Sequence, residues 1–86
     1  MAVVALRAPL SQRTGGTGRH EVPGATVGEV LRGLEQRYPT VTGWILDEQG
    51  RVRPHVSVFV NGERMGENTP VAPADVLQVL PSISGG

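Results

Sequence analysis

The sequence predicts an α+β domain in which one helix packs against one mixed β-sheet. Residues 56–60 alternate valine with Ser57 and Phe59, and they are followed by Asn61-Gly62, a pair typical of tight β-hairpins. Residues 26–38 carry apolar side chains at helical spacing. Apolar runs at residues 3–7 and 75–80 have strand character. One helix among several strands favours an α+β layout with the element order β-β-α-β-β-β.

The first unit is expected to be a β-hairpin. Residues 3–7 form its first strand and residues 20–22 its second. Residues 11–19 between them hold three glycines and are interpreted as a turn. This glycine cluster lacks the lysine and the spacing of a phosphate-binding loop, so a hairpin turn is the better interpretation.

The helix has clear start and stop signals. Thr26 is a suitable N-cap, and Glu29 three residues later completes a capping box. Pro39 ends the helix and disfavours helical geometry at the residue before it. Gly28 and Gly33 weaken the helix, so its stability should depend on packing against the sheet. The stripe expected to face the sheet consists of Val27, Val30, Leu31, Leu34 and Tyr38. The residues expected to lie off this stripe are Arg32, Glu35, Gln36 and Arg37.

The middle of the chain is less regular. Residues 40–54 are expected to contain a short helical turn that closes the core with Val41, Trp44, Ile45 and Leu46. Residues 47–50 are interpreted as a solvated turn, and their acids do not match a metal-binding pattern. Residues 63–65 form a short return strand, and residues 67–74 form a loop. His20 and His55 each stand alone, so a structural role is expected for both.

Composition excludes several classes of function. Eighty-six residues make one small domain. Eight arginines balance eight acidic residues, which argues against nucleic acid or an anionic membrane as the main partner. The absence of cysteine excludes disulfides, thiolate metal sites and a thiol nucleophile. Residues 1–6 are too short for a signal sequence or a membrane span, so we expect a cytoplasmic protein. We also expect it to be a monomer.

The last residues form the candidate reactive segment. Residues 1–80 are expected to make the domain and residues 81–86 a flexible tail that ends in Gly85-Gly86. Glycine has no side chain, so such a tail can enter a tunnel that would clash with any Cβ atom. The carboxylate of Gly86 is therefore the expected reactive group. The alternative is an ordinary frayed terminus.

Four segments carry a resemblance to a known family. They are Arg-Thr-Gly-Gly at residues 13–16, Thr-Val-Gly-Glu-Val-Leu at residues 26–31, Val-Phe-Val-Asn-Gly at residues 58–62, and residues 75–86 with the closing Gly-Gly. Over nearly its whole length the chain resembles sulfur-carrier proteins of the MoaD/ThiS family, most of all the CysO-type carriers. The resemblance implies a ubiquitin-like β-grasp fold.

The resemblance also implies a function. An E1-like adenylyltransferase and sulfurtransferase of the MoeB/ThiF type would use ATP to adenylate Gly86, and sulfur would then replace AMP to give a thiocarboxylate. A downstream biosynthetic enzyme would take that sulfur for cysteine, molybdopterin, thiamine, tRNA thiolation or a natural product. The tail that enters these partners is Pro81, Ser82, Ile83, Ser84, Gly85 and Gly86. The carrier itself would bind no cofactor and no metal, and would have no catalytic side chain.

An alternative function uses the same tail. A ubiquitin-like protein modifier would also be activated at Gly86 but would be conjugated to lysines of target proteins. The sequence does not separate the carrier from the modifier. A stand-alone enzyme would need a nucleophile or an acid–base pair of side chains, and the sequence offers neither.

Strand alternation predicts a docking surface. If the valines of residues 56–60 face the helix, Phe59 faces outward. The same reasoning turns Leu80 outward at the end of the last strand and Arg7 outward at the end of the first. Contiguous exposed apolar residues mark partner sites, so Arg7, Phe59 and Leu80 are the predicted docking surface. The alternative is that a single exposed phenylalanine has no special role.

Overall fold

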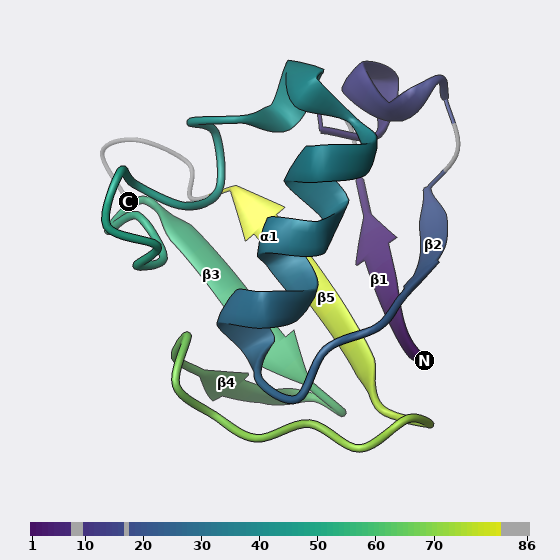
Figure 1. Ribbon diagram of the computed structural model, residues 1–86, viewed down its shortest axis with the longest axis vertical. Helices are drawn as coiled ribbons and strands as arrows, with labels where there is room; N and C mark the ends of the chain where they lie inside the picture. Colours follow the sequence, from purple (N-terminus) through teal and green to yellow (C-terminus); the bar gives the residue numbers. More distant parts are fainter. Residues whose placement is uncertain (8–9, 17, 82–86) are drawn as a thin grey trace.

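The computed structural model describes residues 1–7, 10–16 and 18–81 (Figure 1). Its elements follow the predicted order, with two short 3₁₀ helices added. The strands are β1 (Ala2–Leu6), β2 (Arg19–Val22), β3 (Val56–Val60), β4 (Glu63–Met65) and β5 (Val76–Pro81). The helices are η1 (Leu10–Thr14), α1 (Val27–Arg37) and η2 (Pro39–Val41).

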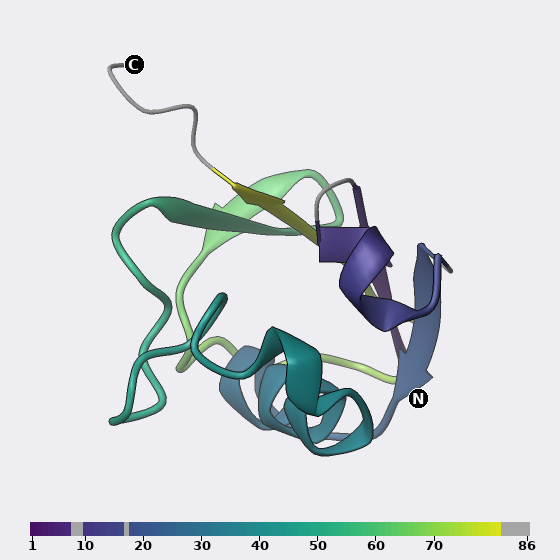
Figure 2. The ribbon, with the colours of Figure 1, turned by 90° about the horizontal axis from the view of Figure 1, so that it is seen from above.

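The five strands form one sheet in the order β2-β1-β5-β3-β4. β1 and β5 are parallel neighbours, and every other neighbouring pair is antiparallel. α1 packs on one face of this sheet, and no element within the described residues covers the other face (Figures 1 and 2). This is the ubiquitin-like β-grasp arrangement, which confirms the expected fold.

The core lies between the sheet and α1. Val56, Val58 and Val60 are buried, whereas Ser57 and Phe59 between them are only partly buried. β1 shows the same alternation, since Val4 and Leu6 are buried. The predicted inward faces are therefore correct. The helix contributes Val27, Val30, Leu31 and Leu34 to the core, and Tyr38 packs against it while partly exposed.

The ends of α1 match the sequence signals. The Glu29 backbone N–H donates to Thr26 Oγ1 at 3.2 Å, and Glu29 Oε1 accepts from the backbone N–H of Ala25 at 3.2 Å. The capping box therefore closes one residue earlier than in its usual form. Tyr38 has φ −128° and ψ 85°, outside the helical region, as expected before Pro39.

Two helix glycines allow close packing. A Cβ atom at Gly33 would lie 2.9 Å from Val22 Cγ1 on β2, and one at Gly28 would lie 3.2 Å from the Glu67 carbonyl oxygen. That carbonyl accepts a hydrogen bond from the Gly28 N–H at 2.9 Å. The residues that weaken an isolated helix therefore let β2 and the 66–75 loop approach it.

The interpretation of residues 11–19 as a plain turn was incomplete. They overlap η1, whose last residue Thr14 is 1% exposed. Thr14 Oγ1 donates to the Ser11 carbonyl oxygen at 3.0 Å and lies 3.1 Å from His20 Nε2. The His20 ring is buried and meets the Tyr38 ring edge to face at 4.9 Å. This buried polar contact fixes a helical turn that polarity and glycine content did not reveal.

Two side chains occupy positions other than those expected. Glu35 was placed off the helix's apolar stripe, but it is 8% exposed. Burial raises the pKa of its carboxyl group, although hydrogen bonds from the Gly43 and Leu46 backbone oppose that shift. Trp44 was expected in the core, but it is 44% exposed, whereas Ile45 and Leu46 are buried. The 42–46 segment folds back over the end of α1, so Glu35 anchors its backbone and Trp44 faces outward.

Candidate functional site

The tail is attached to the centre of the sheet. β5 lies between β1 and β3, and its last residue, Pro81, pairs with Val56. Proline has no N–H, so it cannot continue donating to the ladder. β5 therefore ends in the middle of the sheet, between β1 and β3 (Figure 2). Residues 82–86, which include the predicted reactive Gly86, lie outside the described residues.

The three predicted docking residues lie together on the sheet face that α1 leaves open. Phe59 pairs with Gln78, and Leu80 pairs with Ser57, so Phe59 and Leu80 are diagonal neighbours across the β3–β5 ladder. Both are partly buried. Arg7 is exposed and follows Leu6, whose partner is Val79, so it lies beside Leu80 on this face.

Sequence reasoning missed two members of this surface. Val3 of β1 pairs with Val76 of β5, and both are partly buried. Because their neighbours Val4 and Leu77 are buried, Val3 and Val76 face outward. The same alternation that identified Phe59 could have identified them. We call the four side chains Val3, Phe59, Val76 and Leu80 the apolar patch.

The described residues contain no group of three histidine, cysteine or acidic side chains that could hold a metal ion. His20 is buried against Thr14, and His55 is exposed just before β3, so the two histidines occupy separate environments. No helix in the described part of the chain is long and apolar enough to span a membrane.

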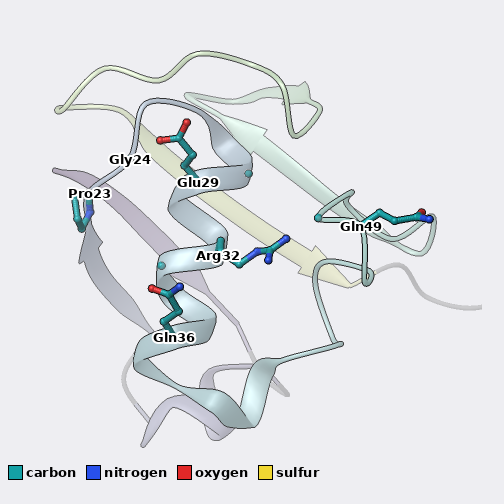
Figure 3. Close-up of a pocket in the computed structure, with 9 residues that line it drawn as sticks. Pro23, Gly24, Glu29, Arg32, Gln36 and Gln49 are labelled. Carbon is teal, nitrogen blue, oxygen red and sulfur yellow. The ribbon is translucent and has the colours of Figure 1, made fainter.

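A cavity of about 600 Å³ lies away from this surface, along the solvent side of α1 (Figure 3). Arg32, Gln36 and Gln49 border it (Figure 3). Gly24, Gly28, Gly33 and Gly50 also line it. It lies on the other side of the helix from the sheet, and it shares no residue with the apolar patch.

The sequence profile of the ThiS family matches residues 4–86. The chain belongs to the ThiS family. The matched region includes Gly85 and Gly86, so the final pair of glycines falls within the family's own boundaries. Membership confirms the resemblance found in the sequence.

Relatives of this ThiS-family chain are named either as modifier proteins or as sulfur carriers. Small archaeal modifier protein 3 of Haloferax volcanii is 41% identical over 66 residues, which cover 72% of this chain and 71% of that protein. Sulfur carrier protein CysO of Mycobacterium tuberculosis is 30% identical over 83 residues, covering 90% of this chain and 89% of that protein. A chain in the crystal structure of the Amycolatopsis orientalis BexX/CysO complex superposes with a TM-score of 0.89 at 29% identity, and the match covers 100% of both chains.

Proposed function

We propose that this ThiS-family chain is a sulfur carrier whose Gly86 carboxylate is adenylated and then converted to a thiocarboxylate. The observation that carries the proposal is the family match through Gly85-Gly86, joined to a central strand that leads directly into that segment. The relative named sulfur carrier protein CysO, which aligns over 90% of this chain, supports the same function.

In the proposed reaction, the partner enzyme supplies ATP and the carrier supplies the carboxylate that is activated. A carboxylate is a poor electrophile until one oxygen becomes a good leaving group. An E1-like enzyme supplies ATP, the Gly86 carboxylate displaces pyrophosphate, and an acyl-adenylate results. The terminal sulfur of a persulfide donor then displaces AMP and forms an acyl persulfide. A thiol attacks the donor's inner sulfur, which breaks the S–S bond, releases the thiocarboxylate and leaves a disulfide on the donor. The carrier contributes a slim carboxyl terminus and a docking surface, and a downstream biosynthetic enzyme takes the sulfur.

The docking surface of this proposal is the apolar patch together with Arg7. The patch lies on the open sheet face, and Leu80 is one residue before the end of β5. An enzyme seated on this face would receive the segment after Pro81 at its own active site. Contiguous apolar side chains on an otherwise polar surface are the usual mark of such a contact.

A second candidate function is protein modification. The relative with 41% identity is named a small archaeal modifier protein, which favours conjugation of Gly86 to lysines of target proteins. Both functions begin with the same adenylate and differ in the nucleophile that attacks it: a sulfur donor in one case and a lysine amine in the other.

ATP–pyrophosphate exchange tests the shared first step. A purified E1-like adenylating enzyme, ATP and this chain should exchange labelled pyrophosphate in a carrier-dependent way. Addition of a sulfur donor should then give a thiocarboxylate, and addition of lysine-containing proteins should give conjugates only if the chain is a modifier. Failure of exchange with every E1-like enzyme from the source organism would refute the proposed function.

A further inference from the structure

Three exposed arginines lie near one end of the sheet, although the formal net charge of the chain is zero. Arg7 follows the end of β1, Arg13 lies in η1, and Arg19 begins β2. β1 runs parallel to β5, so these three positions lie at the end of the sheet where β5 finishes (Figure 1). All three side chains are exposed. We call Arg7, Arg13 and Arg19 the basic collar.

Three of the eight acidic residues lie at the opposite end. Glu63 pairs with Val60 at the far end of β3, Asp75 directly precedes β5, and Glu29 lies in the first turn of α1. Within the described residues the only ion pair joins Arg51 to Asp47, with Nε and Oδ2 3.5 Å apart. Within the described residues, none of the three collar arginines forms an ion pair.

One member of the collar is held in place. The Arg13 guanidinium carbon lies 3.8 Å from the centre of the exposed Trp44 ring. Thr40 Oγ1 also donates a hydrogen bond to the Arg13 carbonyl oxygen. A guanidinium stacked on an indole still presents its N–H donors at its edge, in the fork that suits a carboxylate. Arg13 can therefore bind a carboxylate without further ordering of its side chain.

The other two members flank the apolar patch. Arg19 pairs with Ala5, and Ala5 pairs with Gln78, so Arg19 lies on the outward face. Arg7 lies on that face beside Leu80, next to the end of β5. The apolar patch therefore meets positive charge at the end of the sheet from which the tail leaves.

We propose that the basic collar docks onto acidic side chains of the E1-like enzyme, around the opening of the site that receives the tail. This inference rests on the proposed function. Charge complementarity of this kind speeds association and fixes orientation more than it adds affinity. An attraction at the end of the sheet where β5 finishes would orient the carrier with that end toward the enzyme.

Steady-state adenylation kinetics test the proposal. The probe is a purified E1-like enzyme that activates the unaltered chain, assayed at low and at high ionic strength. Arg7→Glu combined with Arg19→Glu should raise the KM for the carrier by about tenfold or more at low salt, with kcat changed by less than about twofold. Added salt should raise the KM of the unaltered chain and narrow its difference from the variant.

Arg32→Glu is the control. Arg32 is also exposed, but it lies on α1, on the other side of the helix from the sheet, and it is no part of the docking surface. Its KM should change by less than about twofold, because an effect of net charge alone would appear in both variants. Arg13→Lys separates charge from stacking: it keeps the charge but loses the fork, and its KM should rise by an intermediate amount.

The outcomes separate this inference from the proposed function. If no E1-like enzyme activates the unaltered chain, the proposed function fails. If activation occurs but KM is insensitive to salt and to Arg7→Glu with Arg19→Glu, only the collar is refuted. An equal rise of KM in Arg32→Glu would also refute it. Tighter binding of the chain to tRNA than to the enzyme, abolished by the Arg7 and Arg19 changes, would assign the collar to nucleic acid and overturn the proposal.

Discussion

Phe59 and Leu80 lie diagonally across the β3–β5 ladder on the sheet face opposite α1, because Phe59 pairs with Gln78 and Leu80 pairs with Ser57. Their neighbours along the strands, Val58 and Val79, pair with each other inside the core. Adjacent residues on each strand therefore differ in role: one side chain packs in the core and supports the fold, and the next is available to a partner.

Phe59→Asp should weaken partner binding far more than it weakens folding. Phe59 is only partly buried, so an aspartate there should cost about 1 kcal/mol of unfolding free energy. Val58→Asp is the contrast, because Val58 is 1% exposed and an unpaired charge there should cost about 3 kcal/mol or more. Chemical denaturation and binding to the activating enzyme measure the two effects. Unfolding of Phe59→Asp would show that the outward face is wrongly assigned.

Loss of Gly86, or Gly85→Val, should abolish adenylation and leave the fold unchanged. The described core ends at β5, and a β-branched side chain at residue 85 would obstruct a narrow tunnel. Thermal unfolding should match that of the unaltered chain within about 0.5 kcal/mol. Undiminished pyrophosphate exchange with the Gly86 deletion would contradict the role of the tail.

The fold was largely predictable because its signals are local. Alternation at residues 56–60 and the Asn-Gly pair located β3, β4 and their turn, in which Asn61 and Gly62 have φ 50° and 90°. Thr26 and Pro39 bounded α1 correctly. The apolar face of each strand also followed from alternation, and the three residues predicted to dock a partner lie on one face of the sheet.

The features that were missed depend on distant contacts. Thr14 is buried because it meets His20 on the next strand, and Glu35 is buried because the 42–46 backbone folds over it. The basic collar joins three separate elements through a parallel pairing of β1 with β5. Local periodicity carries no information about which distant segments meet. The net charge of zero also gave no sign that three arginines lie near one end of the sheet.

Gly33→Ala should destabilise the protein although alanine favours helices. The added Cβ would lie 2.9 Å from Val22 Cγ1, and Val22 is 1% exposed, so the core must shift. We expect a net cost of about 1 kcal/mol after the gain in helix propensity. Gln36→Ala is the control, since Gln36 is exposed on the same helix and should change stability by less than about 0.5 kcal/mol. Urea denaturation measures both, and a stabilised Gly33→Ala would contradict the packing argument.

The buried carboxyl of Glu35 predicts a pH dependence of stability. Burial raises its pKa above the usual value of 4.5, so the folded state binds this proton more tightly than the unfolded state does. The contribution of Glu35 to the free energy of unfolding is therefore greatest at pH values below 4.5 and decreases as pH rises through the folded-state pKa. Glu35→Gln should remove that decline, so its stability relative to the unaltered chain should improve from pH 4 toward pH 7. A constant difference across that range would contradict it.

The activated chain should not form lysine-linked chains of itself. It contains no lysine and no cysteine, and its arginines stay protonated and non-nucleophilic at neutral pH. Incubation with the activating enzyme and ATP, without a sulfur donor, should give no ladder of carrier-only multimers on a denaturing gel. A ladder whose cross-links map to internal residues would refute this expectation, whereas single copies on other proteins would agree with the modifier function.

The central claim is that sulfur is carried on Gly86, and intact-mass spectrometry after reaction with the E1-like enzyme, ATP and a sulfur donor tests it most directly. The claim predicts a product heavier than the starting chain by the mass difference between sulfur and oxygen, with fragmentation placing the change at Gly86. Deletion of Gly86 should leave the mass of the shortened chain unaltered under the same conditions. An unaltered mass of the full chain despite pyrophosphate exchange, or a sulfur atom placed on any other residue, would contradict the claim.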